Sequence, residues 1–257
     1  MTKSDERTKP ALLRFSRDAE MEVWPTIPAA ELVTAAPVQR GLTWLDVPGY
    51  GLSAGIWDCT AQTSTPFVQS SHEFMLLLEG EVTIVEASGS TTFRAGDALV
   101  LPQGLRCQWV QPGYVRKFWM TFEDAALDVT DGSAATGLHA ILVDPGAMLT
   151  PSPPPPVSVL ASAAPVQHAF EAFTDPSGQF SVGVWDTTAY HRTPAPMDRW
   201  ELMHILEGEA SLVDGSGIAV PLSAGDTILA PLAAATAWNG TGYLKKIYCL
   251  FTPRREG

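Results

Sequence analysis

The chain has 257 residues, of which 46% are apolar and 17% charged, and its formal net charge is −12. A nucleic-acid partner would need concentrated Lys and Arg, and these number only 16 against 28 Asp and Glu. No apolar stretch approaches the roughly 18 residues that a membrane span needs. We therefore expect a globular protein with neither a nucleic-acid nor a membrane partner.

The first 22 residues are predicted to form a mobile tail. They begin with a charged segment, residues 1–10, that leads into no apolar core with a cleavage site, so they do not resemble a signal peptide. The three cysteines, Cys59, Cys107 and Cys249, lack the spacing of a redox or zinc motif and fit reduced thiols. These features predict a cytoplasmic protein.

After the tail, the chain repeats itself at an interval of 128 residues, which becomes 129 after a one-residue insertion. The matching segments are 36–39 with 164–167, 55–58 with 183–186, 78–81 with 206–209, and 95–97 with 224–226. Unrelated segments do not keep such a register. Each copy is also longer than the ~20–50 residues of a solenoid repeat. The chain is therefore a duplicated domain, with repeats at 36–123 and 164–252.

Each repeat consists of short apolar or alternating runs separated by Gly, Pro and Asp, a pattern typical of an all-β sandwich or barrel. In the first copy the runs are 52–59, 73–78, 81–85, 90–93, 98–101, 107–110 and 115–122. A further weak run at 138–143 is expected either to add an edge strand or to pack across the face between the domains.

Four consecutive prolines, residues 153–156, lie between the copies and favour an extended, semi-rigid connector. We therefore predict an N-terminal domain at 23–150, a Pro-rich linker at 151–158 and a C-terminal domain at 159–257.

The motifs of the first repeat resemble those of the cupin superfamily. They are Leu-Glu-Gly-Glu from Leu78, Gly-Asp from Gly96 and Pro-x-Gly from Pro102. Gly-Ile-Trp-Asp from Gly55 and a closing Tyr-x-Arg-Lys from Tyr114 are similar to the cupin subgroup of EutQ-like and ureidoglycine aminohydrolase proteins. The resemblance covers both copies and implies two tandem jelly-roll barrels. It implies little about function, because this fold hosts enzymes and plain binding modules.

The resemblance also implies a metal site of two His in an H-x-H pair, a Glu, and a third His, a ligand set that suits Mn, Fe, Ni or Zn. Glu73 and Glu201 occupy the Glu position. The H-x-H positions contain no His in either copy, and the third His position holds Cys107 or Thr236. We therefore expect no cofactor.

Two fallback ligand sets remain open: His72, Glu73 and Cys107 in the first copy, or His191, Glu201 and His204 in the second. Strand alternation opposes both, because adjacent residues such as His72 and Glu73 point to opposite faces. A divalent transition metal bound by such an atypical set is the alternative to a metal-free site.

Alternation also predicts an inward carboxylate beside an inward lysine in each barrel. The proposed acid–base groups are Glu73 with Lys117 and Glu201 with Lys246, paired because burial of an unpaired charge is costly. The expected ligand-binding residues are Trp57, Cys107, Trp109, Trp185, His191, Met203, Thr236, Trp238 and Tyr248. The alternative is that both lysines lie outside the barrels and the aromatic residues form ordinary core.

The sequence therefore predicts a cupin that binds a small polar metabolite in a barrel pocket, with an acid–base role open to it. One alternative is a metal-dependent aminohydrolase, isomerase or dioxygenase, and another is a non-catalytic sensor or assembly protein. Polar groups near the mouth of the second copy, including Arg192 and Arg199, favour that barrel as the ligand site. The open sheet edges of the barrels favour packing of one copy on the other, and homodimerisation.

Overall fold

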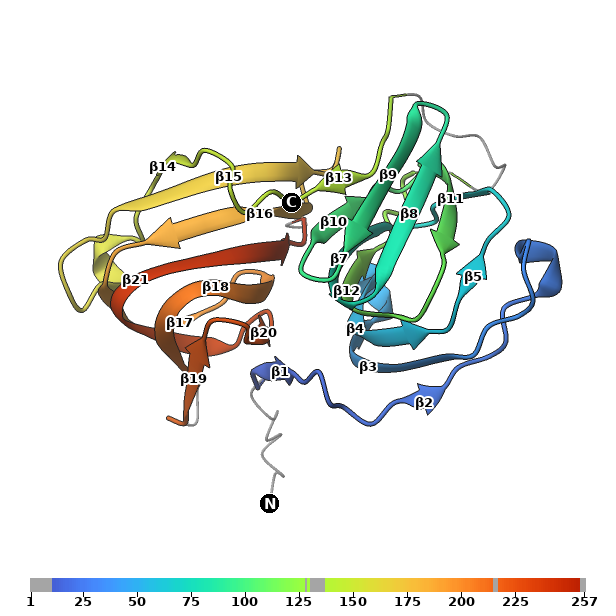
Figure 1. Ribbon diagram of the computed structural model, residues 1–257. Helices are drawn as coiled ribbons and strands as arrows, with labels where there is room; N and C mark the ends of the chain where they lie inside the picture. The colour runs from blue at the N-terminus through green and yellow to red at the C-terminus, as the bar shows by residue number, and fades with distance from the viewer. Residues whose placement is uncertain (1–10, 128, 130–136, 215–216, 255–257) are drawn as a thin grey trace, which may run out of the picture. The chain divides into compact units, whose positions relative to one another are not determined.

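The computed structural model describes residues 11–127, 129, 137–214 and 217–254. These residues form strands joined by turns and by three short 3-10 helices, η1 (Ala29–Glu31), η2 (Pro48–Tyr50) and η3 (Val157–Val159). They contain no α-helix, and no helix that could cross a membrane. The all-β prediction is confirmed (Figure 1).

The described chain divides into two compact units. One contains Ala147–Phe170 and Val184–Thr252 together with the described residues up to Arg14, and holds the C-terminal barrel. The other contains Phe15–Gly146, Glu171–Gly183 and the described end of the chain from Pro253, and holds the N-terminal barrel. The division therefore runs through the second repeat, where we expected one continuous domain at 159–257.

The N-terminal barrel is built from two sheets. The larger has the order β13-β10-β7-β12-β4-β3-β2 and the smaller β5-β11-β8-β9, with β6 paired to β11. The strands are β2 (Glu22–Val23), β3 (Gln39–Val47), β4 (Leu52–Cys59), β5 (Gln62–Thr63), β6 (Phe67–Val68), β7 (His72–Glu79), β8 (Glu81–Glu86), β9 (Gly89–Arg94), β10 (Ala98–Leu101), β11 (Arg106–Gln111), β12 (Val115–Phe122) and β13 (Ile141–Leu142). Three of them, β4, β10 and β12, begin and end at the predicted residues.

The core of this barrel follows the period-two alternation of its strands. On β7, Met75 and Leu77 point into the cluster that fills the barrel, where they meet Trp57, Trp109 and Trp119. The run at 138–143 contributes β13, which pairs with β10 through Leu99 and Leu142. Of the two readings of that run, the edge strand is the one that forms.

The C-terminal barrel has a nine-stranded sheet in the order β1-β20-β18-β21-β16-β15-β14, with β17 paired to β21 and β19 to β18. The strands are β1 (Leu13–Phe15), β14 (Thr150–Ser152), β15 (Gln167–Thr174), β16 (Phe180–Thr187), β17 (Tyr190–Pro196), β18 (Trp200–Val213), β19 (Ala219–Ser223), β20 (Thr227–Ala230) and β21 (Ala235–Phe251). β18 and β21 continue through register shifts where the first barrel has two separate strands each. Met203, Ile205 and Trp238 lie in its core.

The predicted linker at 151–158 is wrong, because the structural repeat begins earlier than residue 164. In the first copy β2 pairs with β3, Glu22 opposite Gly41. In the second copy β14 pairs with β15, Thr150 opposite Ala169, which is the same pairing 128 residues later. η3 likewise follows η1 at that interval. The proline segment is therefore the opening segment of the second barrel.

The predicted mobile tail is wrong for residues 13–15, which form β1. Phe15 is 4% exposed and packs against Trp44, with ring centroids 4.4 Å apart, and against Phe118, at 5.4 Å. The alternation of Leu13 and Phe15 about Arg14 is a strand signal, which is easily overlooked in so short a segment. Residues 1–10 lie outside the described part of the chain.

Candidate functional site

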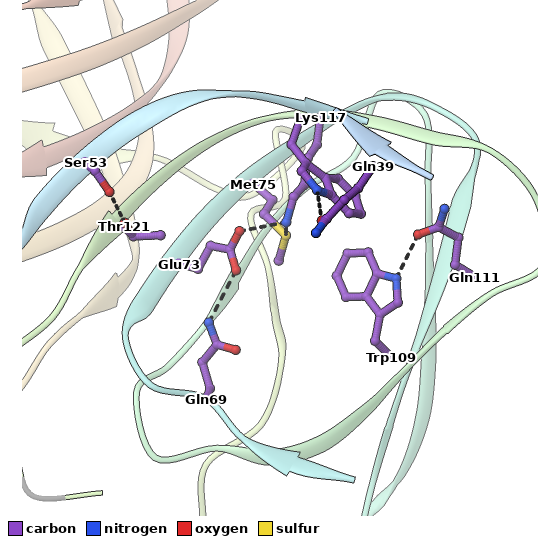
Figure 2. A network of polar contacts seen from close by, with 10 residues as sticks. Gln39, Ser53, Gln69, Glu73, Met75, Trp109, Gln111, Lys117 and Thr121 are labelled. Atoms are coloured by element: carbon purple, nitrogen blue, oxygen red, sulfur yellow. Dashed lines mark hydrogen bonds and ion pairs between the residues drawn. The ribbon is translucent and has the colours of Figure 1, made fainter. Parts of the chain in front are cut away.

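An ion pair lies inside the N-terminal barrel. Glu73 on β7 and Lys117 on β12 come from neighbouring strands, and Lys117 Nζ lies 2.7 Å from Glu73 Oε1. The same Nζ lies 3.0 Å from Met75 Sδ, while Gln69 Nε2 donates to Glu73 Oε2 at 3.3 Å (Figure 2). Lys117 is 7% exposed. The exterior position that was the alternative for this lysine is therefore wrong.

Two indole rings enclose the lysine. Lys117 Nζ lies 4.9 Å from the ring centroid of Trp57 and 5.0 Å from that of Trp109, within the range of a cation–π contact. The two rings meet edge to face at 87°. Each is oriented by a hydrogen bond. Trp57 Nε1 donates to Gln39 Oε1 at 3.0 Å. Trp109 Nε1 donates to Gln111 Oε1 at 2.9 Å (Figure 2).

The ion pair and both indoles line a cavity of about 360 Å³. Its other walls come from the opening segment, from residues 62–69 before β7 and from the end of β10. They comprise Ile27, Glu31, Leu32, Gln62, Ser64, Thr65, Phe67, Gln69 and Leu101. Cys107, predicted to bind ligand, lies in the core next to this cavity and does not line it. Burial raises the pKa of its thiol to about 12, so Cys107 is protonated near neutral pH and does not act as a nucleophile.

The C-terminal barrel repeats this arrangement at equivalent positions. Lys246 Nζ lies 2.6 Å from Glu201 Oε1, 4.6 Å from the ring centroid of Trp185 and 5.7 Å from that of Trp238. The two indoles again meet edge to face, at 88°. Lys246 is 7% exposed, like its counterpart in the first barrel.

This second ion pair lines a cavity of about 430 Å³. Of the residues predicted to bind ligand, Trp185, Met203, Thr236, Trp238 and Tyr248 line it. The opening segment also contributes, through Ser152 and the four prolines that follow it. The segment predicted to be a linker is therefore a wall of the candidate site.

Two arginines distinguish this cavity from the first. Arg192 on β17 and Arg199 before β18 both line it. Burial alone would raise the pKa of Glu201, but Lys246, Arg199 and Arg192 together hold it below its ordinary value. Glu201 is therefore ionised near neutral pH.

His191, predicted to bind ligand or metal, does not line this cavity. It is exposed, and its backbone N–H donates to Ser162 Oγ at 2.9 Å. Its neighbours on β17, Tyr190 and Arg192, point the other way and line the cavity, as strand alternation requires. The sequence reasoning missed Tyr190, whose ring stacks on Trp238 at 5.8 Å and 20°.

Neither fallback metal set is assembled. His72 is 1% exposed, accepts a hydrogen bond from the Gln103 N–H at Nδ1 and stacks on Phe122, away from Glu73. His204 Nδ1 pairs with Thr227 Oγ1 at 2.8 Å. The described residues contain no group of three His, Cys, Asp or Glu that could hold a metal ion. Because a lysine ammonium already contacts each inward carboxylate, the donors present do not fit the metal that the cupin fold implies.

The fold is shared with solved proteins. A protein of unknown function from Pseudomonas syringae pv. tomato, assigned to the DUF861 family, has 25% identity and a TM-score of 0.74, covering 94% of this chain and 100% of that one. The Escherichia coli protein Ylba, also of the DUF861 family, has 12% identity and a TM-score of 0.56, covering 96% and 92%. Lactobacillus farciminis oxalate decarboxylase, solved as a formate complex, has 12% identity and a TM-score of 0.50, covering 95% and 87%.

The family comparison covers both repeats. No curated protein matches the chain. The model of the EutQ-like cupin domain matches residues 48–119 and 174–248, which together make up more than half of the chain and hold both ion pairs. With two jelly-roll barrels and two matched regions, this chain belongs to the EutQ-like cupin domain family.

Proposed function

We propose that this protein binds a small polar metabolite in its barrel cavities, and that the lysine–glutamate pair under two indoles is the recognition element. One observation carries the proposal. An almost fully buried ammonium touches a carboxylate on a cavity wall in both barrels, at 2.7 Å and 2.6 Å.

The energetics of buried charge support a role beyond stability. Removing two charges from water costs several kcal/mol per ion, and their mutual attraction often fails to offset that cost. A core of this size could be filled by apolar side chains instead, yet both barrels keep the pair beside empty volume. Convergent polar groups in a mostly apolar concave pocket are typical of a ligand site.

The pair defines the chemistry of the ligand. The ammonium donates to a carbonyl or carboxylate oxygen, and the carboxylate accepts from an amide or amine N–H. The indole faces of Trp57 and Trp185 offer apolar contact to the body of the ligand. A ligand bound in this way would have a proton donor and a proton acceptor within reach, so the same groups could serve general acid–base chemistry without a metal.

A thermal-shift screen of the purified protein against ureides, amino acids and sugar acids tests the proposal. We expect at least one compound to raise Tm in a concentration-dependent way, since a ligand that binds the folded state stabilises it by mass action. Silence across the panel would contradict the proposal and favour an assembly or sensor role.

Elemental analysis tests the rival metal-dependent enzyme. We expect substoichiometric Mn, Fe, Ni and Zn in protein purified without chelators. Near-stoichiometric metal that is lost in Glu73→Ala or Glu201→Ala would overturn the metal-free proposal, because it would place the metal on the carboxylates that we assign to the lysines.

A further inference from the structure

The two cavities share their ion pair and indoles but differ in the charges around them. The first cavity is lined by one cation, Lys117, and two carboxylates, Glu31 and Glu73. The second is lined by three cations, Arg192, Arg199 and Lys246, and one carboxylate, Glu201. In a chain whose net charge is −12, the second cavity is a local concentration of positive charge.

The repeat places this difference at particular positions. Arg192 lies 128 residues after Ser64, and the equivalence is structural, because Leu32 bridges to Ser64 as Leu160 bridges to Arg192. Arg199 follows Ser71 at the same interval, and Val159 follows Glu31. The first barrel therefore has neutral residues at the positions of both arginines, and the second has a neutral residue at the position of the extra carboxylate.

The arginines differ in how far other groups already satisfy them. Arg199 forms an ion pair with Asp198, Nε to Oδ1 at 2.7 Å. Among the described residues, Arg192 forms no ion pair of this kind with a carboxylate. Its Nη2 donates to Thr236 Oγ1 at 2.9 Å and, at 3.3 Å, to the Thr236 carbonyl. Arg192 is therefore the cation most available to a ligand.

Unsatisfied donors gather at this cavity. Six buried side-chain polar atoms lack a partner in the described part of the chain, and three belong to residues that line the second cavity: Arg192 Nε, Ser152 Oγ and Trp238 Nε1. A buried donor without an acceptor costs about 1–3 kcal/mol, and more when it is charged. Arg192 Nε can only donate, so it favours a ligand that brings acceptor oxygens, and the Ser152 hydroxyl can donate to the same oxygens.

Resting on the proposed function, we propose that the C-terminal barrel is selective for small carboxylates, and that Arg192 is the residue that sets this selectivity. Arg192 binds the carboxylate through its free donors. The aromatic walls, Trp185 and Trp238 with Tyr190 and Tyr248, pack on the body of the ligand. The N-terminal barrel, with Ser64 in place of Arg192 and with Glu31 added, excludes such anions.

Three compounds of one shape and three charges test this proposal: benzoate, benzamide and benzylamine. Isothermal titration at low ionic strength should give saturable benzoate binding at one site per chain, at least about tenfold tighter than benzamide, with no benzylamine binding at that site. Arg192→Ser, which installs the residue of the first repeat, should weaken benzoate at least about tenfold and leave benzamide unchanged. Arg106→Ser is the matched control, because Arg106 is exposed on β11 and lines neither cavity.

Two further variants guard against misfolding. Arg192→Gln keeps a donor for Thr236 without the charge and should lose benzoate as Arg192→Ser does. Arg192→Lys keeps the charge without the planar fork and should bind benzoate with intermediate affinity. Equal binding of benzamide, or undiminished benzoate binding by folded Arg192→Ser and Arg192→Gln, would overturn the anion assignment.

The two proposals fail in different ways. The metabolite screen could give ligands of which the uncharged compounds bind the C-terminal barrel more tightly than the corresponding carboxylates. In that case the assignment to carboxylates is wrong and the proposed function stands. If no compound of any charge binds, both are wrong.

Discussion

The indole nitrogens of the two barrels have different environments. Trp109 Nε1 donates to Gln111. The second repeat has Gly240 at that position, and Trp238 Nε1 has no hydrogen-bond partner among the described residues. A side chain at Gly240 would begin 2.8 Å from that nitrogen. The indole N–H of Trp109 is therefore hydrogen-bonded because Gln111 is present, and that of Trp238 lacks this bond because Gly240 replaces the glutamine.

Replacing Gln111 should therefore destabilise the N-terminal barrel. Gln111 is 1% exposed, accepts from Trp109 and donates to the carbonyls of Cys59, Thr60 and Gly113. Gln111→Ala leaves these buried groups unpaired and should lower the free energy of unfolding by about 2–4 kcal/mol. Urea denaturation measures this.

The control for that experiment is Gln108→Ala. Gln108 donates to a single carbonyl, that of Ser64, at 2.8 Å and is only partly buried. Gln108→Ala should lower the free energy of unfolding by about 1 kcal/mol or less. Equal losses in the two variants would contradict the assigned network.

His72 makes stability depend on pH. Burial holds the pKa of His72 below its usual value of 6.5, and nearby carboxylates oppose this only in part. The unfolded chain therefore binds a proton that the folded chain does not, once the pH falls below about 6.5. The contribution of neutral His72 to the free energy of unfolding is fully present above pH 6.5. It is lost as the pH falls from 6.5 towards the depressed pKa of the folded state.

Denaturant titrations between pH 7.5 and 5.5 check this effect. His72→Gln keeps an acceptor for the Gln103 N–H and should flatten the dependence, whereas His139→Gln, at an exposed site, should leave it as in the wild type. A dependence of unchanged slope in His72→Gln would rule out His72 as its source.

At the residue scale, the sequence predicted which types of residue form the site better than it predicted which way each side chain points. The Glu position of the cupin pattern gave the inward phase of Glu73 and Glu201. These two carboxylates line the cavities, and so do the lysines predicted beside them, Lys117 and Lys246. β17 reads Tyr-His-Arg-Thr-Pro-Ala-Pro, which has no alternation from which to read a phase. His191 was chosen for its metal-binding chemistry, and its two neighbours are the residues that point inward.

The turn between β7 and β8 illustrates how an element depends on one glycine. Gly80 has φ +80°, and a Cβ there would clash with the Tyr114 carbonyl; Gly208 has φ +83° and faces the Tyr243 carbonyl in the same way. These are the glycines of the two Leu-Glu-Gly-Glu motifs. The motif recurs because the backbone at each glycine lies against the backbone of the neighbouring strand, where a side chain has no room. Its glycine is therefore explained by the fold and not by ligand binding.

Gly80→Ala should therefore destabilise the barrel by more than the conformational strain alone. Gly96→Ala is the matched control, because Gly96 has φ +96° but nothing within 4 Å of an added Cβ. Gly96→Ala should lower the free energy of unfolding by about 1–2 kcal/mol, from backbone strain alone. Gly80→Ala should cost at least about 2 kcal/mol more in urea denaturation. Equal costs would mean that the carbonyl contact is unimportant.

At the element scale, strand prediction succeeded where a largely apolar run is bounded by turn residues, as in β4, β10 and β12. It failed for the opening segment of the second barrel, because four prolines give the same extended backbone in a linker as in a barrel wall. Pro156 has φ −53° and ψ 139°, values that a free polyproline segment also adopts. Only the pairing of β14 with β15 distinguishes the two, and it is a tertiary contact.

For the molecule as a whole, duplication preserved the pair and changed its surroundings. Both barrels keep a lysine, a carboxylate and two indoles in nearly the same geometry. They differ at the walls, where Ser64 and Ser71 are replaced by Arg192 and Arg199. This divergence fits two sites that share one mode of recognition and differ in ligand charge.

The most direct test of this account is calorimetric titration of the strongest ligand from the screen into two matched neutral variants. Glu73→Gln with Lys117→Met, and Glu201→Gln with Lys246→Met, each remove one buried pair while keeping side-chain size. We predict that one double variant loses at least about tenfold in affinity, while the other binds like the wild type and both retain cooperative unfolding. Wild-type affinity in both folded variants would contradict the claim that the pairs recognise the ligand.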